Sequence, residues 1–138
     1  MSNLVIYTDG GYCIPKQVGG WGMVVTLDEE VVETKHDVVK DSTSNRMEMT
    51  AFITALKYTS EPVTIVTDSN YVVQGCNAWL KGWKAKGWRK ADGQPILNMD
   101  LWQEIDSLLR ENVTVKWIKG HAGHKFNELV DSLTRGYE

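Results

Sequence analysis

The sequence predicts one α/β domain over residues 1–138, with a mixed sheet and flanking helices in the order βββαβααβα. Three Val-rich segments near the N-terminus are separated by short connections, which favours an antiparallel meander. Residues 63–118 then follow the order strand, helix, strand, which favours parallel pairing because parallel strands need a long crossover. A chain of 138 residues can build one ordinary core and is too short for two typical domains.

Three strands and a helix are expected in the first half of the chain. The strands are predicted at residues 4–9, 20–27 and 31–39. The helix is predicted to begin at Asn45, because Glu48 three residues later completes a capping-box pattern, and to end at Glu61-Pro62. Its apolar side is expected to cover the sheet, with Glu48 leaning toward Asp9 at the end of the first strand.

The second half of the chain alternates strands and helices around a broken segment. We predict strands at 63–68 and 113–118, and helices at 69–80, 98–110 and 125–136. Asn98 or Asp100 is the expected cap of the second of these helices. Gly82 and Gly87 interrupt the helical pattern, so the segment after residue 80 is expected to be irregular.

Four carboxylates lie where strands or helices expose them. Asp9 and Asp68 end two predicted strands, and open α/β sheets bind ligands at the carboxyl ends of their strands. Glu48 opens a helix, and Asp131 lies in the last one. Carboxylates gathered at one place repel one another unless cations lie between them, and all-oxygen ligation suits Mg²⁺ or Mn²⁺. Two such ions about 4 Å apart serve phosphodiester hydrolysis, so the pattern predicts a metal-dependent phosphoryl-transfer enzyme.

Each acid taken alone also has a structural explanation. Asp9 fits a turn at a strand end, Asp68 fits a helix cap, and Glu48 fits its capping box. Asp131 fits the solvated face of a terminal helix. Only the joint arrangement of the four favours a metal site over these separate roles.

His121 lies in the small-residue loop Lys119-Gly120-His121-Ala122-Gly123-His124, before the last predicted helix. Glycines allow unusual backbone angles there, so a swinging imidazole is expected. The unperturbed pKa of histidine is near neutral, which suits donation of a proton to a leaving oxygen. The alternative is an ordinary surface histidine, and His124 is expected only to start the helix.

A basic segment contrasts with the net charge of −3. Residues 69–91 contain no acid and five bases, namely Lys81, Lys84, Lys86, Arg89 and Lys90. Phosphate contact explains this cluster, and a solvated face is the alternative. Trp79, Trp83 and Trp88 interleave with the bases. Trp79 and Trp83 share one helical face, which fits either a packed cluster or stacking on a sugar; packing is favoured for Trp79 and Trp88, and a contact role is left open for Trp83.

Taken in order, the motifs resemble bacterial-type ribonuclease H over almost the whole chain. The residues that carry the resemblance are Thr8-Asp9-Gly10, Asn45-Arg46-Met47-Glu48, Thr67-Asp68-Ser69, Trp79, Trp83-Lys84, Gly87-Trp88, 98–102, 119–124 and Asp131. The resemblance implies a ribonuclease H-like fold with a five-stranded mixed sheet, three antiparallel strands followed by two parallel ones. It also implies endonucleolytic cleavage of RNA in RNA–DNA hybrids, giving 5′-phosphate and 3′-hydroxyl ends.

The resemblance further assigns roles to residues of this chain. Asp9, Glu48, Asp68 and Asp131 would be the catalytic acids that bind two Mg²⁺ ions, with Mn²⁺ as a substitute, and His121 would be the mobile catalytic group. The implied substrate-binding residues are Gly10, Asn45, Asn70, Trp83, Lys84, Lys86 and Asn98. Residues 81–90 would be a basic protrusion that grips the DNA strand. The chain departs from the family at residues 13–18, where a Gly-Asn-Pro-Gly type turn is usual, at Ser44 and at Asn70.

The sequence also leaves other functions open as alternatives. A non-catalytic hybrid-binding module would be expected to have lost a metal ligand. A ribonuclease H-fold nuclease that cuts DNA or single strands is another alternative, and the basic segment and the His121 loop favour cleavage of hybrids over it. A calcium-binding protein would need a closely spaced Asp/Asn loop of the EF-hand kind. No window has the roughly 20 apolar residues of a membrane span, and Met1-Ser2-Asn3 shows no secretory signal, so a cytoplasmic location is expected. We also expect a free-standing monomer without a small-molecule cofactor, whose partner is the RNA–DNA hybrid.

Overall fold

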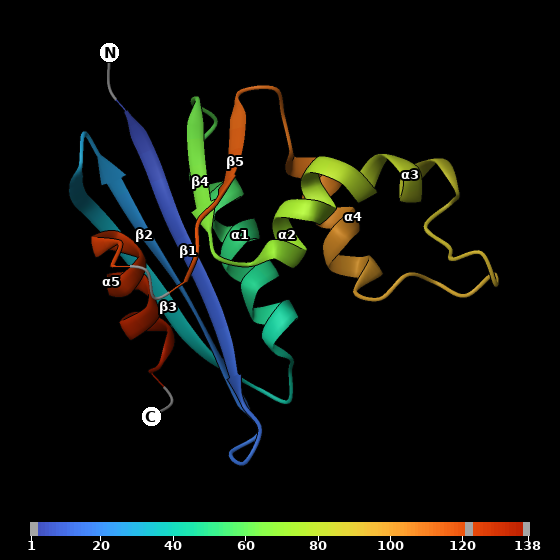
Figure 1. Ribbon diagram of the computed structural model, residues 1–138, viewed down its shortest axis with the longest axis horizontal. Helices are drawn as coiled ribbons and strands as arrows, with labels where there is room; N and C mark the ends of the chain where they lie inside the picture. The colour runs from blue at the N-terminus through green and yellow to red at the C-terminus, as the bar shows by residue number, and fades with distance from the viewer. Residues whose placement is uncertain (1–2, 121–122, 137–138) are drawn as a thin grey trace.

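One mixed sheet organises the computed structural model, which describes residues 3–120 and 123–136. Its strands are β1 (Leu4–Cys13), β2 (Val18–Leu27), β3 (Glu30–Lys40), β4 (Val63–Thr67) and β5 (Val113–Trp117). They lie in the order β3-β2-β1-β4-β5 (Figure 1). β1, β2 and β3 pair antiparallel, whereas β4 pairs in parallel with both β1 and β5. The predicted mixed sheet of three antiparallel and two parallel strands is confirmed.

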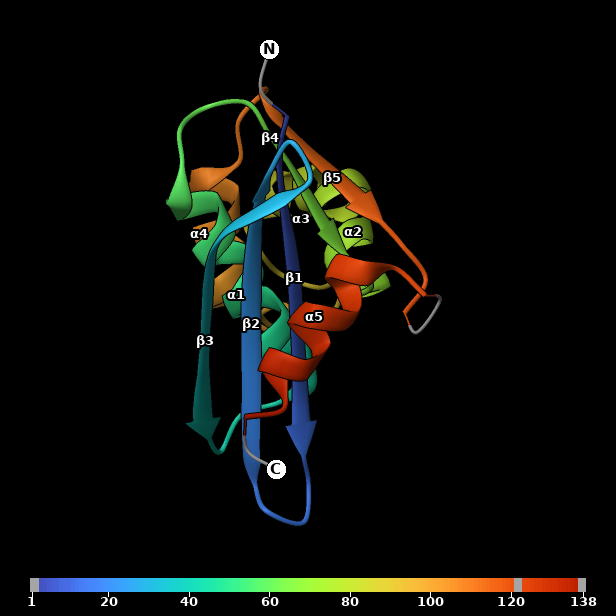
Figure 2. The ribbon, with the colours of Figure 1, turned by 90° about the vertical axis from the view of Figure 1, so that its left-hand side faces the viewer.

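Helices cover both faces of the sheet. They are α1 (Ser44–Tyr58), α2 (Asn70–Gln74), α3 (Leu80–Ala85), α4 (Met99–Leu108) and α5 (Lys125–Thr134), with a π-helical turn η1 (Gly75–Trp79). Figure 2 shows α5 in front of β1 and β2, with α1 behind them. The glycines of β2 show the same arrangement, because a Cβ on Gly19 would meet Met47 of α1 and one on Gly22 would meet Val130 of α5. No helix among the described residues is both long and apolar enough to span a membrane.

The main core lies between the sheet and α1. Ile6, Phe52, Ile65, Trp102 and Ile105 are fully buried in it. The centre of the sheet is therefore fixed by apolar packing, with α4 held on the outer side of α1 by Trp102 and Ile105. The paired parts of β1 and β4 that precede Asp9 and Asp68 are thereby packed on this core.

Three predicted boundaries are wrong for identifiable reasons. β1 continues beyond Asp9 to Cys13, because its antiparallel pairing with β2 runs on to Cys13 opposite Val18. α1 is capped by Thr43, whose side chain accepts a hydrogen bond from the Arg46 N–H, so the capping box at Asn45 does not form. The predicted helix 69–80 changes to a π-helical turn at Gly75. A Cβ on Gly75 would lie 1.9 Å from the Trp102 ring, so this turn accommodates the indole.

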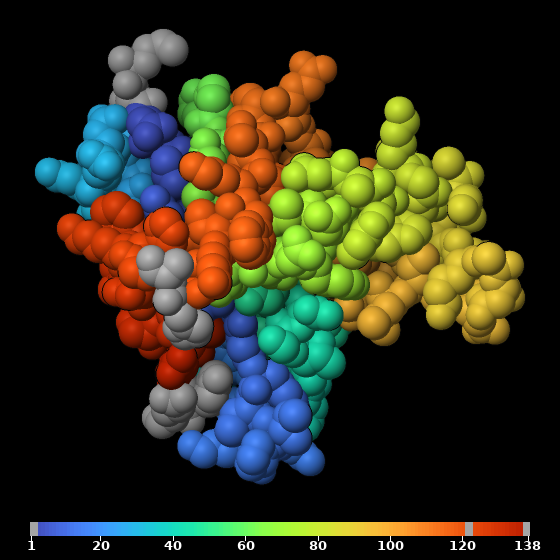
Figure 3. All heavy atoms as spheres, in the orientation of Figure 1, coloured from blue at the N-terminus to red at the C-terminus, as the bar shows by residue number. Residues whose placement is uncertain are grey.

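α3 and residues 86–98 project from the body of the molecule, as Figures 1 and 3 show on the right-hand side. An isolated bridge between Arg89 and Pro95 closes this protrusion. The ring of Trp83 packs 5.3 Å from that of Trp102, and Lys84 forms an ion pair with Asp106 of α4 at 3.2 Å. The basic segment is thus anchored at its base and extends away from the sheet.

Candidate active site

The parallel pairing of β1 and β4 brings two of the predicted acids together. The last residue pair of the parallel register is Thr8 opposite Thr67. Asp9 directly follows Thr8, and Asp68 directly follows Thr67. Glu48 approaches from α1. One carboxylate oxygen from each of the three acids lies within 4.8 Å of those of the other two. The expectation that α1 brings Glu48 near Asp9 is confirmed.

Gly10 allows α1 to approach β1 this closely. A Cβ at this position would lie 2.3 Å from the backbone nitrogen of Glu48 and 2.4 Å from the carbonyl carbon of Met47. The Gly10 N–H also donates a hydrogen bond to the Glu48 carboxylate. Gly10, predicted from the family resemblance as a substrate contact, therefore has a structural role in placing Glu48.

Asp131 of α5 lines the same hollow as the three acids. The hollow has a volume of about 360 Å³ and is lined by Asp9, Gly10, Gly11, Tyr12, Ser44, Glu48, Asp68, Asp131, Thr134 and Arg135. The carboxyl group of Asp131 shares a hydrogen bond with that of Asp9. Asp131 is not within the compact group of three, and it forms an ion pair with Arg135 at 3.1 Å. The fourth acid therefore lies next to the cluster, and the charge of its carboxylate is partly neutralised by Arg135.

Burial and like charge make ionisation of this cluster unfavourable. Burial, followed by the charge of Asp68 and the contacts with Asp131, raises the pKa of Asp9 to about 8. Burial, and then the charges of Asp9 and Asp68, raises the pKa of Glu48 well above its usual value. Oε2 of Glu48 is buried without a hydrogen-bond partner among the described residues. A divalent cation would relieve the repulsion and supply the missing partner, so these residues fit a hard metal ion.

Two residues that sequence reasoning missed fix the position of Asp68. The indole Nε1 of Trp117 donates a hydrogen bond to the backbone carbonyl of Asp68 at 3.1 Å. A Cβ on Gly120 would lie 2.7 Å from Oδ2 of Asp68, so a larger residue here would require the Asp68 carboxylate to shift. The glycine before His121 was the available signal, but its partner could not be identified without the fold.

The substrate-binding residues predicted from the resemblance are dispersed around this centre. Asn45 and Asn70 are exposed, at the start of α1 and of α2. None of the four predicted residues farther along the chain lines the acidic hollow, namely Trp83, Lys84, Lys86 and Asn98. His121 lies outside the described residues, so its role stays a prediction.

Asn98 forms part of a network that joins three helices. Its Oδ1 accepts a hydrogen bond from Arg46 at 3.2 Å, and its Nδ2 donates one to the Tyr71 hydroxyl at 3.2 Å. Arg46 also binds Asp100 through two hydrogen bonds, at 2.8 and 3.0 Å. The same hydroxyl of Tyr71 accepts a hydrogen bond from Trp102. This network ties the N-terminal turn of α1 to α4, which steadies the element that carries Glu48.

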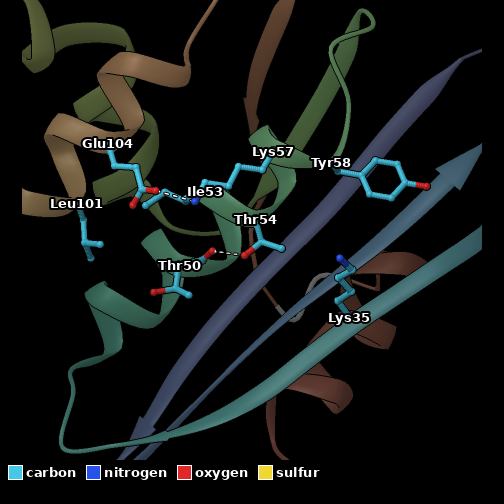
Figure 4. Close-up of a pocket in the computed structure, with 8 residues that line it drawn as sticks. All are labelled: Lys35, Thr50, Ile53, Thr54, Lys57, Tyr58, Leu101 and Glu104. Atoms are coloured by element: carbon cyan, nitrogen blue, oxygen red, sulfur yellow. Dashed lines mark hydrogen bonds and ion pairs between the residues drawn. The ribbon is translucent and has the colours of Figure 1, made fainter.

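A second hollow lies at the other end of α1, between this helix, β3 and α4 (Figure 4). Lys35 reaches across from β3, while Lys57 of α1 forms an ion pair with Glu104 of α4 at 2.7 Å. The hydroxyls of Thr50 and Thr54 donate to carbonyls of their own helix. This hollow therefore lacks the converging acids that distinguish the first one.

The fold and the acidic hollow together define a metal-dependent phosphoryl-transfer enzyme, with its site where the parallel pairing of the central strands β1 and β4 ends. A family model described as RNase H matches residues 1–137. The chain belongs to the ribonuclease H family, and the expectation of a ribonuclease H enzyme is confirmed. Membership also implies dependence on a divalent metal ion, which the acidic cluster fits.

Individual relatives support this assignment. Ribonuclease H of Ruthia magnifica subsp. Calyptogena magnifica is 42% identical over 137 residues, covering 96% of this chain and 93% of the relative. Ribonuclease H of Cupriavidus pinatubonensis is 43% identical over 136 residues, with coverage of 96% and 93%.

Solved structures show the same fold. LC9-RNase H1, a type 1 RNase H with the type 2 active-site motif, superposes with a TM-score of 0.81 at 29% identity, covering 96% of this chain and 70% of that one. A foamy viral protease-reverse transcriptase in complex with an RNA/DNA hybrid gives a TM-score of 0.84 at 25% identity, over 96% of this chain and 19% of that one.

The metal-free protein is expected to lose stability as the pH rises. The pKa of Asp9 is about 8 in the folded chain, against an ordinary aspartate value of 3.8, so between these values the unfolded chain binds fewer protons. A difference of one bound proton lowers the free energy of unfolding by up to about 1.4 kcal/mol for each unit that the pH rises. The expected loss is roughly 3 kcal/mol between pH 5.5 and 8. Thermal unfolding in a chelator should show this decline, and a divalent ion should reduce it. A decline of equal size in Asp9→Asn would contradict the assignment to Asp9.

Proposed function

We propose that this chain is an endoribonuclease that hydrolyses the RNA strand of RNA–DNA hybrids, using two Mg²⁺ ions and leaving 5′-phosphate and 3′-hydroxyl ends. The observation that carries the proposal is the approach of three acids within 4.8 Å, one of them with a buried oxygen that lacks a partner among the described residues. The foamy viral relative in complex with an RNA/DNA hybrid supports the choice of substrate. Mn²⁺ is the expected substitute ion.

The four acids are proposed to hold the ions. Asp9 lies between the other ligands, because it contacts Glu48 and Asp131 and is within the compact group with Asp68. When bound, the ions would activate water and neutralise the leaving oxygen, as two-metal sites do for phosphodiesters. His121 is proposed as the catalytic group that assists the leaving oxygen or product release.

The exposed polar residues near the acids are proposed to read the hybrid. The RNA 2′-hydroxyl distinguishes RNA from DNA in a minor groove, and Gly10, Asn45 and Asn70 are proposed to contact it. Trp83, Lys84, Lys86 and Asn98 are proposed to contact the DNA strand. Lys86 is exposed, whereas Lys84 must exchange its ion pair with Asp106 for a phosphate. Binding should therefore be insensitive to base sequence and weaken with salt.

The organisation of the protein is also proposed. The five strands belong to one sheet and the family model covers residues 1–137, which supports one ribonuclease H domain over residues 1–138. We propose a monomer that acts in the cytoplasm without a small-molecule cofactor.

Cleavage of labelled nucleic acids tests the proposal. An RNA–DNA hybrid, an RNA duplex, a DNA duplex and both single strands are incubated with the protein and Mg²⁺, with Asp9→Asn as the blank. Cutting of only the RNA strand of the hybrid is expected. Binding of the hybrid without cleavage in Mg²⁺ or Mn²⁺ would favour a non-catalytic binding module, and cutting of DNA would favour a DNA nuclease of the same fold.

A further inference from the structure

Asp131 contacts a cationic side chain within the acidic hollow. Its Oδ2 lies 3.1 Å from Nη2 of Arg135, one helical turn later in α5. Both side chains line the hollow that holds the acid cluster. Arg135 contributes the single cationic side chain among the described residues that line this hollow. The guanidinium of Arg135 thus lies in the acidic hollow beside Asp131.

The end of α5 keeps this pair in place. Thr134 is buried, and its hydroxyl donates to the Val130 carbonyl at 2.8 Å. A Cβ on Gly22 of β2 would lie 3.0 Å from the same hydroxyl, so the last turn of α5 packs closely on the sheet. Because Val130 and Thr134, which directly precede Asp131 and Arg135, pack on the sheet, rotation of the two side chains is enough to change the contact between them.

An arginine in this position competes with a metal ion. Guanidinium remains protonated at all relevant pH values, so its charge cannot be removed when a divalent ion arrives. A carboxylate that pairs with it has less negative charge to offer a second cation, and the two cations repel each other. This competition acts first on Asp131, because Asp131 is the acid that pairs with the arginine.

We infer that Arg135 is a positioning residue that holds Asp131 in the metal-free protein and weakens binding of the second divalent ion, the one that uses Asp131. This inference rests on the proposed function, since it takes Asp131 as a metal ligand. The first ion binds at Asp9, Glu48 and Asp68 and is little affected. Occupation of the second position requires Asp131 to leave Arg135, so this ion pair sets the metal concentration at which the site fills.

Mn²⁺ binding to the free protein tests the inference without reference to activity. Bound Mn²⁺ is counted from the electron paramagnetic resonance signal of the free ion in wild type, Arg135→Gln and Arg135→Lys. In Arg135→Gln the weaker binding step should tighten about three- to tenfold, as expected for loss of a partly exposed ion pair and of repulsion between cations. The tighter step should change by less than about twofold, and Arg135→Lys should resemble wild type. An unchanged or weakened second step in Arg135→Gln would overturn the inference.

Two controls separate the possible failures. Lys125→Gln removes the same charge from the start of α5, at a residue that does not line the acidic hollow, and should leave both steps within about twofold of wild type. Asp131→Asn should abolish the weaker step. If both ions still bind Asp131→Asn as they bind wild type, Asp131 is not a ligand and that part of the proposed function fails. If only Arg135→Gln shows no effect, the inference alone fails.

A measurement on the wild-type protein requires no substitution. The side-chain N–H signal of Arg135 in an NMR titration with Mg²⁺ should shift mainly during the second binding step. A shift completed with the first ion would contradict the assignment of this ion pair to the weaker site.

Discussion

Asp9→Asn is expected to lower cleavage of the RNA–DNA hybrid by about 10³-fold or more while making the metal-free protein more stable. Metal ions contribute several kcal/mol to transition-state stabilisation, and each 1.4 kcal/mol is about tenfold in rate, so loss of the proposed central ligand should have a large effect. The amide has nearly the same shape as the carboxyl group but is neutral without a proton, whereas buried Asp9 with its raised pKa must take up a proton on folding at pH 7. The gain in unfolding free energy at pH 7 should be about 2–4 kcal/mol.

The opposite signs of these two effects identify the role of Asp9. Hybrid cleavage is measured under single-turnover conditions with Mg²⁺, and stability by urea unfolding in a chelator. Asp37→Asn, the same exchange at an exposed position of the edge strand β3, should leave the cleavage rate unchanged and stability within about 0.5 kcal/mol. An Asp9→Asn protein that is inactive because it unfolds would show instead that the carboxylate is structural.

Gly10→Ala is expected to destabilise the protein by about 3 kcal/mol or more and to abolish cleavage. The new methyl group would lie 2.3 Å from the backbone nitrogen of Glu48, and backbone atoms cannot move aside by changing rotamer. The N-terminal part of α1 must then separate from β1. Glu48 moves with it, so the compact group of three acids is disrupted as well.

Gly82→Ala is the matched control for this change. Gly82 lies in α3, and a Cβ there meets nothing within 4 Å. Alanine is the better helix former, so this variant should be more stable by about 0.5–1 kcal/mol. Urea unfolding and hybrid cleavage of both variants are compared. Wild-type stability in Gly10→Ala would mean that β1 and α1 are not packed backbone to backbone as the structure shows.

Much of the fold was predictable because it follows from local patterns. Val-rich segments with short connections define β1 to β3, and the order strand, helix, strand defines the parallel pairing of β4 and β5. The limits of the elements were less predictable, since they depend on partners distant in the sequence. β1 extends past Asp9 because β2 continues to pair with it, and the helical segment from Asn70 changes its turn at Gly75 because Trp102 packs there.

The sequence by itself determined which groups are candidates for the chemistry, because carboxylates, a histidine loop and a basic segment are residue identities that folding does not change. It also determined the family, since these identities recur in one order. Only the tertiary structure decided how deeply each group is buried and which charged or hydrogen-bonding partner it has. It left Asp9 and Glu48 buried beside like charge, gave Asp131 the guanidinium of Arg135, and tied Asn98 to Arg46 and Tyr71. Burial and pairing depend on contacts between residues that are far apart in the sequence, and these contacts form only when the chain folds.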